Sequence, residues 1–368
     1  MKTGKSIPDR IAVIGGLCLL LGMGVFALLW PQKDFSDAER RYLASAPQAP
    51  SLTEWKTDQE TESYLADRIP LRNIWVGIDS CVQAATGRRT TLGSWPAAGA
   101  ILELPVKSSG EKAARRLRQF AALAEKAGAE WQVIVPRSHG YLLREKMNGL
   151  LRTQYEQETE IYKVLEEDPH FADVLPDGTA AEKVYYRTDH HWTLQGAWLA
   201  YAAVCRADGL PVFGLDEFER TSYPGFCGTT RSRSGLPVFS GDTIECAEPK
   251  TDVTMNADGA VYDRLIFPER AETYDGYAVY LDGNHGMTEI LNPDAPGGTL
   301  LVYKDSFANC LLPLLAADYR RIAAVDARYY AGTFSQALEA VGTVDRVLFV
   351  YSADSLVNDT SVAGKAAR

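Results

Sequence analysis

The stretch TLLVYKDSFANCLLPLLAADYRRIAAVDA, residues 299–327, alternates two kinds of pattern. "TLLVYKDS" is an apolar run that predicts a buried strand, "FANCLLPLLAADY" predicts a helix kinked early by Pro313, and "RIAAVDA" predicts a second strand. "FSQALEAVG" and "VDRVLFVYS" then continue with a helix and a strand. This β-α-β-α-β order predicts an α/β fold, with a parallel sheet sandwiched by helices.

The rest of the chain adds elements to this unit. A helix is expected over 111–128 and a buried strand at "WQVIVP", residues 131–136, with another helix over 193–207. Residues 213–288 are expected to form strands and loops, with a hairpin at "NADG", 256–259, and a strand and turn in "DGYAVYLDGNHG", 275–286. Together, 51–358 are expected to be one domain, and the polar tail 359–368 is expected to be frayed.

The charge balance excludes one class of function. The 368 residues carry a formal net charge of −10, and no basic run with interleaved aromatic residues suits a phosphate backbone. The sequence therefore predicts no binding to nucleic acid.

The first residues suggest a membrane segment. Lys2, Lys5 and Arg10 precede "IAVIGGLCLLLGMGVFALLW", an uncharged run with about the length needed to span a bilayer. We expect 1–10 to be a cytoplasmic tail, 11–30 a transmembrane signal anchor ending at Trp30, and 31–50 a juxtamembrane connector. A cleaved signal peptide is the alternative. Beyond the connector, Ser51 and Glu54 predict a capping box that opens a helix before Pro70.

The cysteines give little guidance. There are six, with no C-x-x-C pair, so cysteine-based metal or redox chemistry is not indicated. Cys227 and Cys246 could bridge a loop.

The candidate chemistry begins in "YYRTDHHWTLQGAW", residues 185–198. If this segment is extended, Asp189 and His191 lie on one face and His190 points away from His191. An Asp-x-His pair suits a general base, because the carboxylate fixes the tautomer of the imidazole. A metal site would need two further ligands, and only His139, His170, His285 and carboxylates remain. We expect neither a metal nor a cofactor.

Ser306 is the candidate nucleophile. It directly follows the apolar strand and precedes a helix, so its hydroxyl should lie at the carboxyl edge of the sheet. Backbone N–H groups at the start of that helix could bind an oxyanion. A serine at this position is also a common helix N-cap, and the Asp-x-His pair is what favours catalysis.

These residues carry a family resemblance. "YRTDHHWT" and "KDSFANC" resemble the DHHW proteins, relatives of the periplasmic alginate O-acetyltransferases within the SGNH hydrolase-like group. Weaker matches spread the resemblance over most of the ectodomain: "FSDAERRYLA", "YLADRIPLRN", "FCGTTRSRSG", "YLDGNHGMTEI" and "VDRVLFVYS". The resemblance implies a flavodoxin-like SGNH hydrolase-like fold in a permuted order, with Ser306 as nucleophile, His191 as base and Asp189 as its orienter.

The resemblance also implies a function. It implies O-acetylation of a secreted or cell-surface polysaccharide, with a polytopic membrane-bound O-acyltransferase as partner and an ectodomain outside the cytoplasm. A hydrolase would use the same three residues with water as acceptor. A non-catalytic polysaccharide-binding or assembly component that retains the fold is the alternative from another class.

The sequence departs from ordinary SGNH enzymes around the nucleophile. Lys304 replaces the glycine of G-D-S, and "FVYSADS" offers Ser352 and Asp354 where the G-x-N-D asparagine is expected. Asn284 and Asn309 are the substitute candidates for the oxyanion site.

Three more residues are candidates for substrate contacts. Arg187 could hold the loop of Asp189 or contact an anionic substrate. Trp192 could stack on a sugar ring or lie in the core. His285 follows Asn284 and could reach the site.

Overall fold

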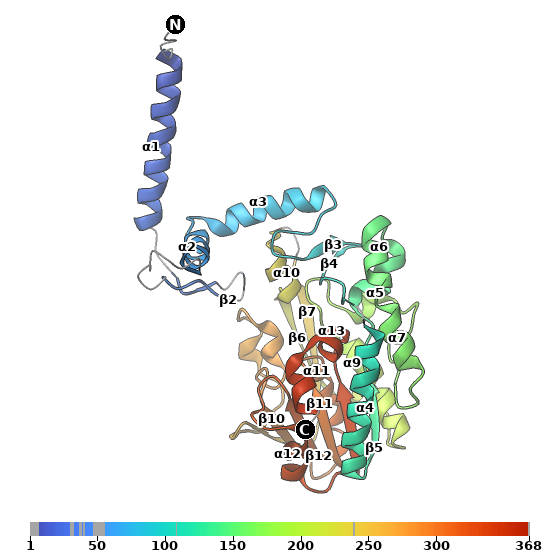
Figure 1. Ribbon diagram of the computed structural model, residues 1–368. Helices are drawn as coiled ribbons and strands as arrows, with labels where there is room; N and C mark the ends of the chain where they lie inside the picture. Colours follow the sequence, from blue (N-terminus) through green and yellow to red (C-terminus); the bar gives the residue numbers. More distant parts are fainter. Residues whose placement is uncertain are drawn as a thin grey trace.

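The structure is a computed structural model that describes residues 7–29, 33–36, 39, 41–46, 56–107, 109–237 and 240–366. It is an α/β protein built on one seven-stranded sheet (Figure 1). The strands of this sheet, in spatial order, are β5 (Glu130–Ile134), β13 (Arg346–Val350), β11 (Gly297–Lys304), β12 (Tyr319–Asp326), β10 (Met287–Leu291), β8 (Thr254–Ala257) and β9 (Ala260–Tyr262).

The predicted parallel sheet forms only half of this arrangement. Strands β5, β13, β11 and β12 are parallel to one another, whereas β10, β8 and β9 add to the β12 edge in antiparallel fashion. The "NADG" hairpin joins β8 to β9 as expected. The fold is therefore mixed, since short connections such as this one can join only antiparallel strands.

Three small two-stranded sheets, fourteen α-helices and four short 3₁₀ helices complete the described elements. The small sheets pair β1 (Phe35–Ser36) with β2 (Arg41–Tyr42), β3 (Trp95–Ala97) with β4 (Ala100–Leu102), and β6 (Glu219–Phe226) with β7 (Asp242–Glu248). The helices are α1 (Ile7–Leu29), α2 (Lys56–Asp67), α3 (Arg72–Ala85), α4 (Gly110–Ala127), α5 (His139–Leu143), α6 (Gly149–Glu156), α7 (Thr159–Glu166), α8 (Ala181–Val184), α9 (Leu194–Ala207), α10 (Thr229–Ser234), α11 (Ala308–Leu315), α12 (Phe334–Val341), α13 (Ala353–Asn358) and α14 (Thr360–Ala366).

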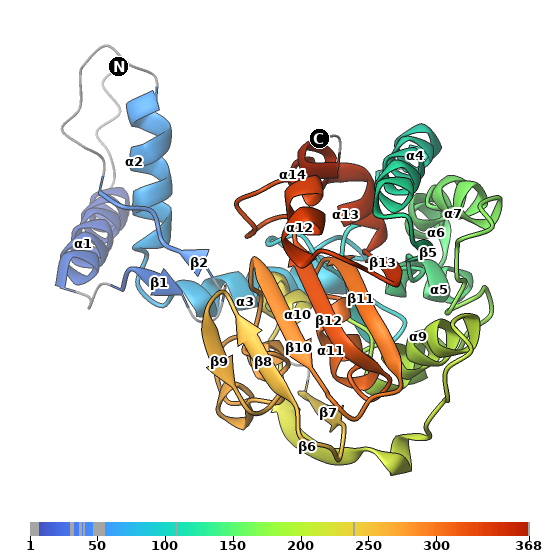
Figure 2. The ribbon, with the colours of Figure 1, turned by 90° about the horizontal axis from the view of Figure 1, so that it is seen from below.

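Helices cover both faces of the sheet, and Figure 2 shows these layers. Strand β11 illustrates the period of two: Leu300 and Val302 belong to the core formed with α9 and α11, while Leu301 and Tyr303 belong to the core with α4, α12 and α14. All eight residues of α11 are buried, including Pro313. Apolar side chains on both faces of the central strands explain why those strands read as continuous apolar runs.

The predictions for the two ends of the chain have different outcomes. The tail was expected to fray, but residues 360–366 form α14, which buries Val362 and Ala366 against α4 and α12. At the other end, residues 7–29 form α1, yet among the described residues no helix is long and apolar enough to cross a membrane. The predicted transmembrane anchor is therefore not confirmed, and Lys2, Lys5 and Trp30 lie outside the described residues, as do Ser51 and Glu54.

Two local predictions are also wrong. "DGYAVYLDGNHG" contains a short 3₁₀ helix at Gly276–Val279 rather than a strand, and Tyr277 and Val279 of this helix are buried in the core. The suggested Cys227–Cys246 bridge does not form, and no disulfide joins any pair of cysteines in the described residues.

Candidate active site

Asp189, His191 and Ser306 meet in the structure, although 115 positions separate the histidine from the serine. The His191 Nε2 atom lies 2.8 Å from the Ser306 Oγ, and its Nδ1 lies 2.5 Å from the Asp189 Oδ1. Ser306 stands at the carboxyl end of β11, where the sequence places it, and Asp189 and His191 lie in the loop before α9. The three side chains thus form one hydrogen-bonded chain from a buried carboxylate to a half-buried hydroxyl.

A tight turn positions the histidine. The Asp189 Oδ1 also accepts the backbone N–H of His191 at 2.9 Å, so the segment bends over its own carboxylate instead of running extended. The expectation that His190 points away from His191 is therefore wrong, since the two rings lie 3.9 Å apart. On its other side, the ring of His191 stacks on Tyr277 at 3.8 Å. Tyr277 was missed in the sequence because its segment reads as a strand.

The second oxygen of Asp189 is held by α10. The Oδ2 atom accepts the N–H of Thr229 at 2.5 Å. This approach needs Gly228, because a Cβ at that position would lie 2.2 Å from the Cβ of Asp189 and 2.3 Å from its Oδ2. The "FCGTT" motif therefore places a glycine where the chain must pass directly over the carboxylate.

Burial and charge set the protonation states of this pair. Burial raises the pKa of Asp189, but the neighbouring His190 and His191 lower it by more, so the net shift is downward and Asp189 stays ionised. Burial, aided by His190, lowers the pKa of His191 to about 4, against the opposing effect of Asp189. His191 is therefore neutral at neutral pH, which is the form that can accept a proton from Ser306.

The turn that carries Ser306 is fixed by Asp305. One oxygen of this carboxylate accepts the N–H of Phe307 at 2.9 Å, and the other accepts the N–H of Ser352 at 2.8 Å, beyond the end of β13. Trp192 also stabilises this turn, because its buried Nε1–H donates to the Phe307 carbonyl at 2.9 Å. Trp192 is thus a core residue and is not available to stack on a sugar.

A second chain of hydrogen bonds lies beside Ser306 and links Lys304, Asn309 and Asn284. The buried ammonium of Lys304 donates to the Asn309 Oδ1 at 2.7 Å. The Asn309 amide then donates to the Gly283 carbonyl at 3.2 Å and to the Asn284 Oδ1 at 3.1 Å. Since an ammonium can only donate and a carbonyl can only accept, this sequence of bonds fixes the orientation of both amides.

The remaining candidates lie elsewhere. Arg187 contacts Asp242 and Ser240 and lines neither of the cavities described below, so the structure favours its loop-holding role. His285 is turned away, with its Nε2 2.9 Å from the Leu281 carbonyl.

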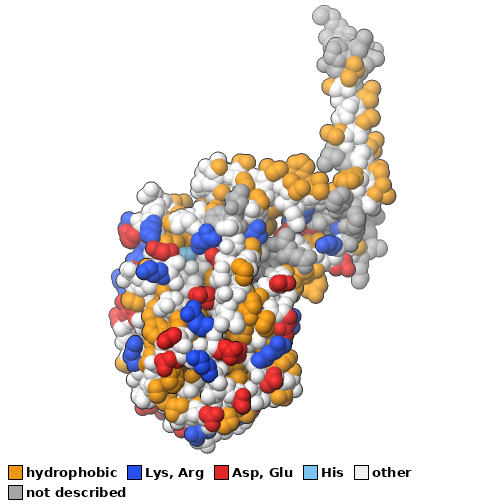
Figure 3. Space-filling view, turned by 180° about the vertical axis from the view of Figure 1, so that it is seen from behind, with side chains coloured by type: hydrophobic (Ala, Val, Ile, Leu, Met, Phe, Trp, Pro, Cys, Tyr) orange, Lys and Arg blue, Asp and Glu red, His pale blue; other side chains and the backbone are white. Residues whose placement is uncertain are grey.

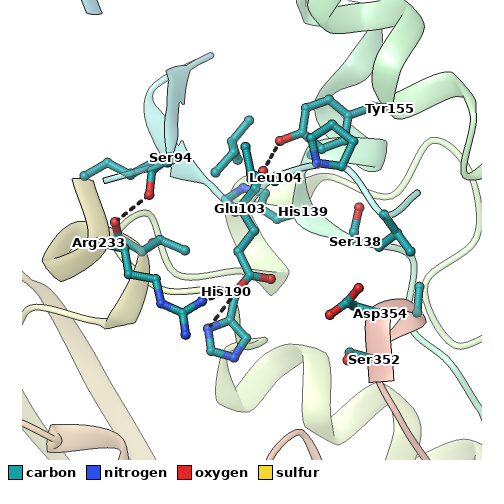
Figure 4. Close-up of a pocket in the computed structure, with 18 of the residues that line it drawn as sticks. Ser94, Glu103, Leu104, Ser138, His139, Tyr155, His190, Arg233, Ser352 and Asp354 are labelled. Atoms are coloured by element: carbon teal, nitrogen blue, oxygen red, sulfur yellow. Dashed lines mark hydrogen bonds and ion pairs between the residues drawn. The ribbon is translucent and has the colours of Figure 1, made fainter. Parts of the chain in front are cut away.

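Two neighbouring cavities open at the site. One, of about 490 Å³, is lined by Ser306, His191, Asn284 and Asn309. The other, of about 620 Å³, lies between the β3–β4 hairpin and α13 (Figure 4). Their linings share six residues, namely Glu103, His190, Arg233, Phe307, Ser352 and Asp354. In Figure 4, Glu103 reaches toward His190 and Arg233 at this boundary.

The second cavity is lined by His139 among other residues. Its ring stacks on Tyr185, and burial lowers its pKa to about 3. Because His190 lines both cavities, together they offer continuous space for a substrate larger than a single small ester.

A metal ion at this site would disturb the hydrogen bonds. Asp189, His190 and His191 each bring one ligand atom within 4.8 Å of the others. However, both oxygens of Asp189 and both ring nitrogens of His191 already have hydrogen-bond partners, and an ion would have to displace them.

The fold and site define an α/β protein with a serine–histidine–aspartate arrangement. A family model described as "DHHW protein" matches residues 173–325, so the resemblance inferred from the sequence is confirmed. No curated protein matches the chain.

Solved structures share the fold. A DHHW family protein from Eubacterium siraeum aligns with a TM-score of 0.61 and 19% identity over 75% of this chain and 96% of its own. PatB1 from Bacillus cereus aligns with a TM-score of 0.59 and 20% identity over 73% of this chain and 98% of its own. A PatB1 structure with a sulfonyl adduct aligns equally well, at 21% identity over 73% of this chain and 97% of its own.

The contact between Gly228 and Asp189 gives a first prediction. In Gly228→Ala, the new methyl group pushes the carboxylate away from His191, so any activity that depends on His191 should fall by up to roughly 10⁴-fold, the loss expected when a triad histidine is left without its orienter. Circular dichroism checks that the variant is folded, and steady-state kinetics measure its rate. Gly364→Ala is the matched control, because Gly364 has open space around it. Equal rates for both variants would show that Asp189 does not depend on this approach.

Proposed function

We propose that this protein is a serine-dependent acyl-transfer enzyme that acts on a cell-surface or secreted polysaccharide, with acetyl as the acyl group. The observation that carries the proposal is the hydrogen-bonded chain from Asp189 through His191 to Ser306. The acetyl group and the polysaccharide rest on the DHHW resemblance, as do the extracytoplasmic location and a polytopic membrane-bound O-acyltransferase that supplies the donor. In SGNH terms, the order Asp-x-His before Ser is a permuted one.

The geometry supports a two-step reaction. The Ser306 Oγ attacks the carbonyl carbon of the acyl donor while His191 Nε2 takes its proton, and the tetrahedral intermediate collapses to an acyl ester on Ser306 as His191 protonates the leaving group. An acceptor hydroxyl then gives its proton to His191 and attacks the ester, which transfers the acyl group and restores Ser306. Water in place of the sugar hydroxyl gives hydrolysis.

Two N–H donors are available for the oxyanion. The backbone N–H of Ser306 has no hydrogen-bond partner among the described residues. The Asn284 amide lines the same cavity, and because its oxygen accepts from Asn309, its NH₂ group is left as a donor. We assign these two groups to the oxyanion site, in place of the G-x-N-D asparagine that the sequence lacks.

Ser306 provides the decisive test. The full chain should hydrolyse a chromogenic acetyl ester and should form a covalent adduct with a sulfonyl fluoride, located on Ser306 by peptide mass spectrometry. A sulfonyl reagent is apt because a PatB1 structure is described with a sulfonyl adduct. Ser306→Ala should lose both properties, whereas Ser361→Ala, on α14, should keep them.

The other outcomes have definite meanings. A rate unaffected by Ser306→Ala would contradict the proposal and favour a non-catalytic polysaccharide-binding component. Loss of activity with a chelator, in the presence of Ser306, would point to metal-dependent hydrolysis. Acetyl ester formation on an added polysaccharide, followed by mass spectrometry, separates transfer from hydrolysis.

The pKa of His191 predicts the acid limb of the pH profile. Only the neutral ring can act as base, so kcat/KM should fall with an inflection near 4 rather than near the ordinary histidine value of about 6.5. Because His190 contributes to this lowering, His190→Gln should move the inflection to higher pH. The profile is measured with the chromogenic ester while circular dichroism monitors the fold. An inflection near 6.5 in the parent protein would show instead that burial and His190 do not lower the pKa of His191.

The hydrogen bonds that link Lys304 to Asn284 through Asn309 predict that substitutions at Lys304 and Asn284 have non-additive effects on kcat. Asn284→Ala should lower kcat by roughly a hundredfold with little change in KM, since one oxyanion donor is lost. Lys304→Met should lower kcat by roughly tenfold, because the Asn309 amide is then free to turn and no longer fixes Asn284. The double variant should match Asn284→Ala alone.

Additive losses would show instead that Lys304 acts independently of Asn284. Thermal melting separates this result from a loss of fold, because Lys304 is buried. Lys183→Met, at an exposed lysine, is the control.

A further inference from the structure

Helix α3 has a face that packs on the body of the protein. Gly77 and Ser80 are buried. A Cβ at Gly235 would lie 2.7 Å from Val76 Cγ1 and 3.1 Å from Ser80 Oγ, so this face rests directly on the loop that follows α10. Small residues at these positions allow the close approach.

The opposite face of α3 is apolar and exposed. Its large side chains Ile74, Trp75, Ile78 and Val82 fall at helical spacing, i, i+1, i+4 and i+8, and each is 53 to 55% exposed. Leu71, which immediately precedes the helix, is 44% exposed. We call this set the outer face of α3, and it comprises Leu71, Ile74, Trp75, Ile78 and Val82. The helix thus turns its larger apolar side chains outward and its small ones inward, the reverse of an ordinary surface helix. Such a continuous apolar patch marks an interaction surface.

The surroundings of the outer face favour a lipid surface. Arg88 and Arg89 follow the end of α3, are exposed, and form no ion pair with any described residue. Arginines beside an apolar face suit anionic headgroups, and the chain as a whole, at −10, has no general excess of cations. Tryptophan, here Trp75, is a residue that settles at the boundary between headgroups and acyl chains.

The first helix of the chain, α1, also suggests a lipid surface. Helix α1 also carries exposed apolar side chains, but around its circumference: Ile11, Val13, Ile14, Leu17, Leu19, Leu21, Val25, Phe26 and Leu29. Figure 3 shows hydrophobic side chains along α1 and along the adjacent upper edge of the body. In Figure 1, α3 lies across the end of the body from which α1 departs. Exposed apolar surface on α1 as well as on α3 fits a lipid surface better than a single protein groove.

We propose that the outer face of α3 docks on a lipid bilayer with anionic headgroups. The helix lies in the plane of the interface, with its apolar side chains among the upper acyl groups and Arg88 and Arg89 at the phosphates. This surface is separate from the proposed chemistry. However, α10 lies between the two, since its residues Thr229, Ser232 and Arg233 line the cavity of Ser306. Docking would therefore hold that cavity close to the membrane surface.

The test uses the full chain and vesicles of phosphatidylcholine with or without phosphatidylglycerol. Acyl chains brominated in the phosphatidylcholine should quench Trp75, and Trp75→Phe should remove that part of the quenching, which isolates α3 from any contact made by α1. Ile78→Glu should weaken partitioning roughly tenfold, and the double variant Arg88→Gln with Arg89→Gln should weaken it by a similar factor only on phosphatidylglycerol vesicles.

Controls and contrary outcomes are distinct. Val261→Glu, at an exposed apolar residue of β9, should bind like the parent, and Ser306→Ala should too. Equal quenching in the parent and in Trp75→Phe would overturn the proposal even if the chain binds vesicles through α1. Self-association in sedimentation that Ile78→Glu abolishes, without quenching of Trp75, would overturn it in favour of a second copy on this face.

Discussion

The fully buried carboxylate of Asp189 is the constraint around which the site is arranged. A buried charge is expensive unless every part of it is paired, and here three N–H groups converge on it. The backbone and ring of His191 serve one oxygen, and the N–H of Thr229 serves the other. Satisfying the carboxylate therefore also fixes the ring of His191 and requires Gly228 next to it. The position of the imidazole follows from the need to solvate a charge without water.

The need to pair a buried charge also applies to Lys304, which stands where ordinary SGNH enzymes have a glycine. Lys304 is buried, and burial lowers its pKa, against the opposing effect of Asp326. The Asn309 oxygen completes its environment, and this bond sets the direction of the amides that follow. A glycine at position 304 could not orient Asn309 or, through it, Asn284. If Asn284 is the oxyanion donor proposed above, Lys304 and the missing G-x-N-D asparagine belong to one arrangement, in which the donor comes from the loop before β10 instead of from the end of β13.

The sequence predicted the elements whose signal is local. The strand–helix alternation after residue 299 was correct because its strands are buried on both faces and its helices follow directly. The meeting of Asp189, His191 and Ser306 was implied by the family resemblance, because the sequence alone does not bring together residues that are 115 positions apart. The hairpin of β8 and β9 was predicted from "NADG", but its antiparallel pairing with β10, and that of β10 with β12, was not, because such pairing depends on contacts distant in the sequence. Tyr277 was missed for a related reason, since only the tertiary contact with His191 gives it a role.

The error at His190 shows how a local rule and a buried charge compete. Alternation along a strand would separate His190 from His191, but the Asp189 side chain captures the N–H two residues ahead and bends the backbone. The bend brings His190 within 3.5 Å of Asp189 and beside the ring of His191. There it lowers the pKa of both neighbours, which helps keep Asp189 ionised and His191 neutral. The position of His190 is therefore explained by its electrostatic effect on the protonation of Asp189 and His191. It does not require that His190 bind a metal ion.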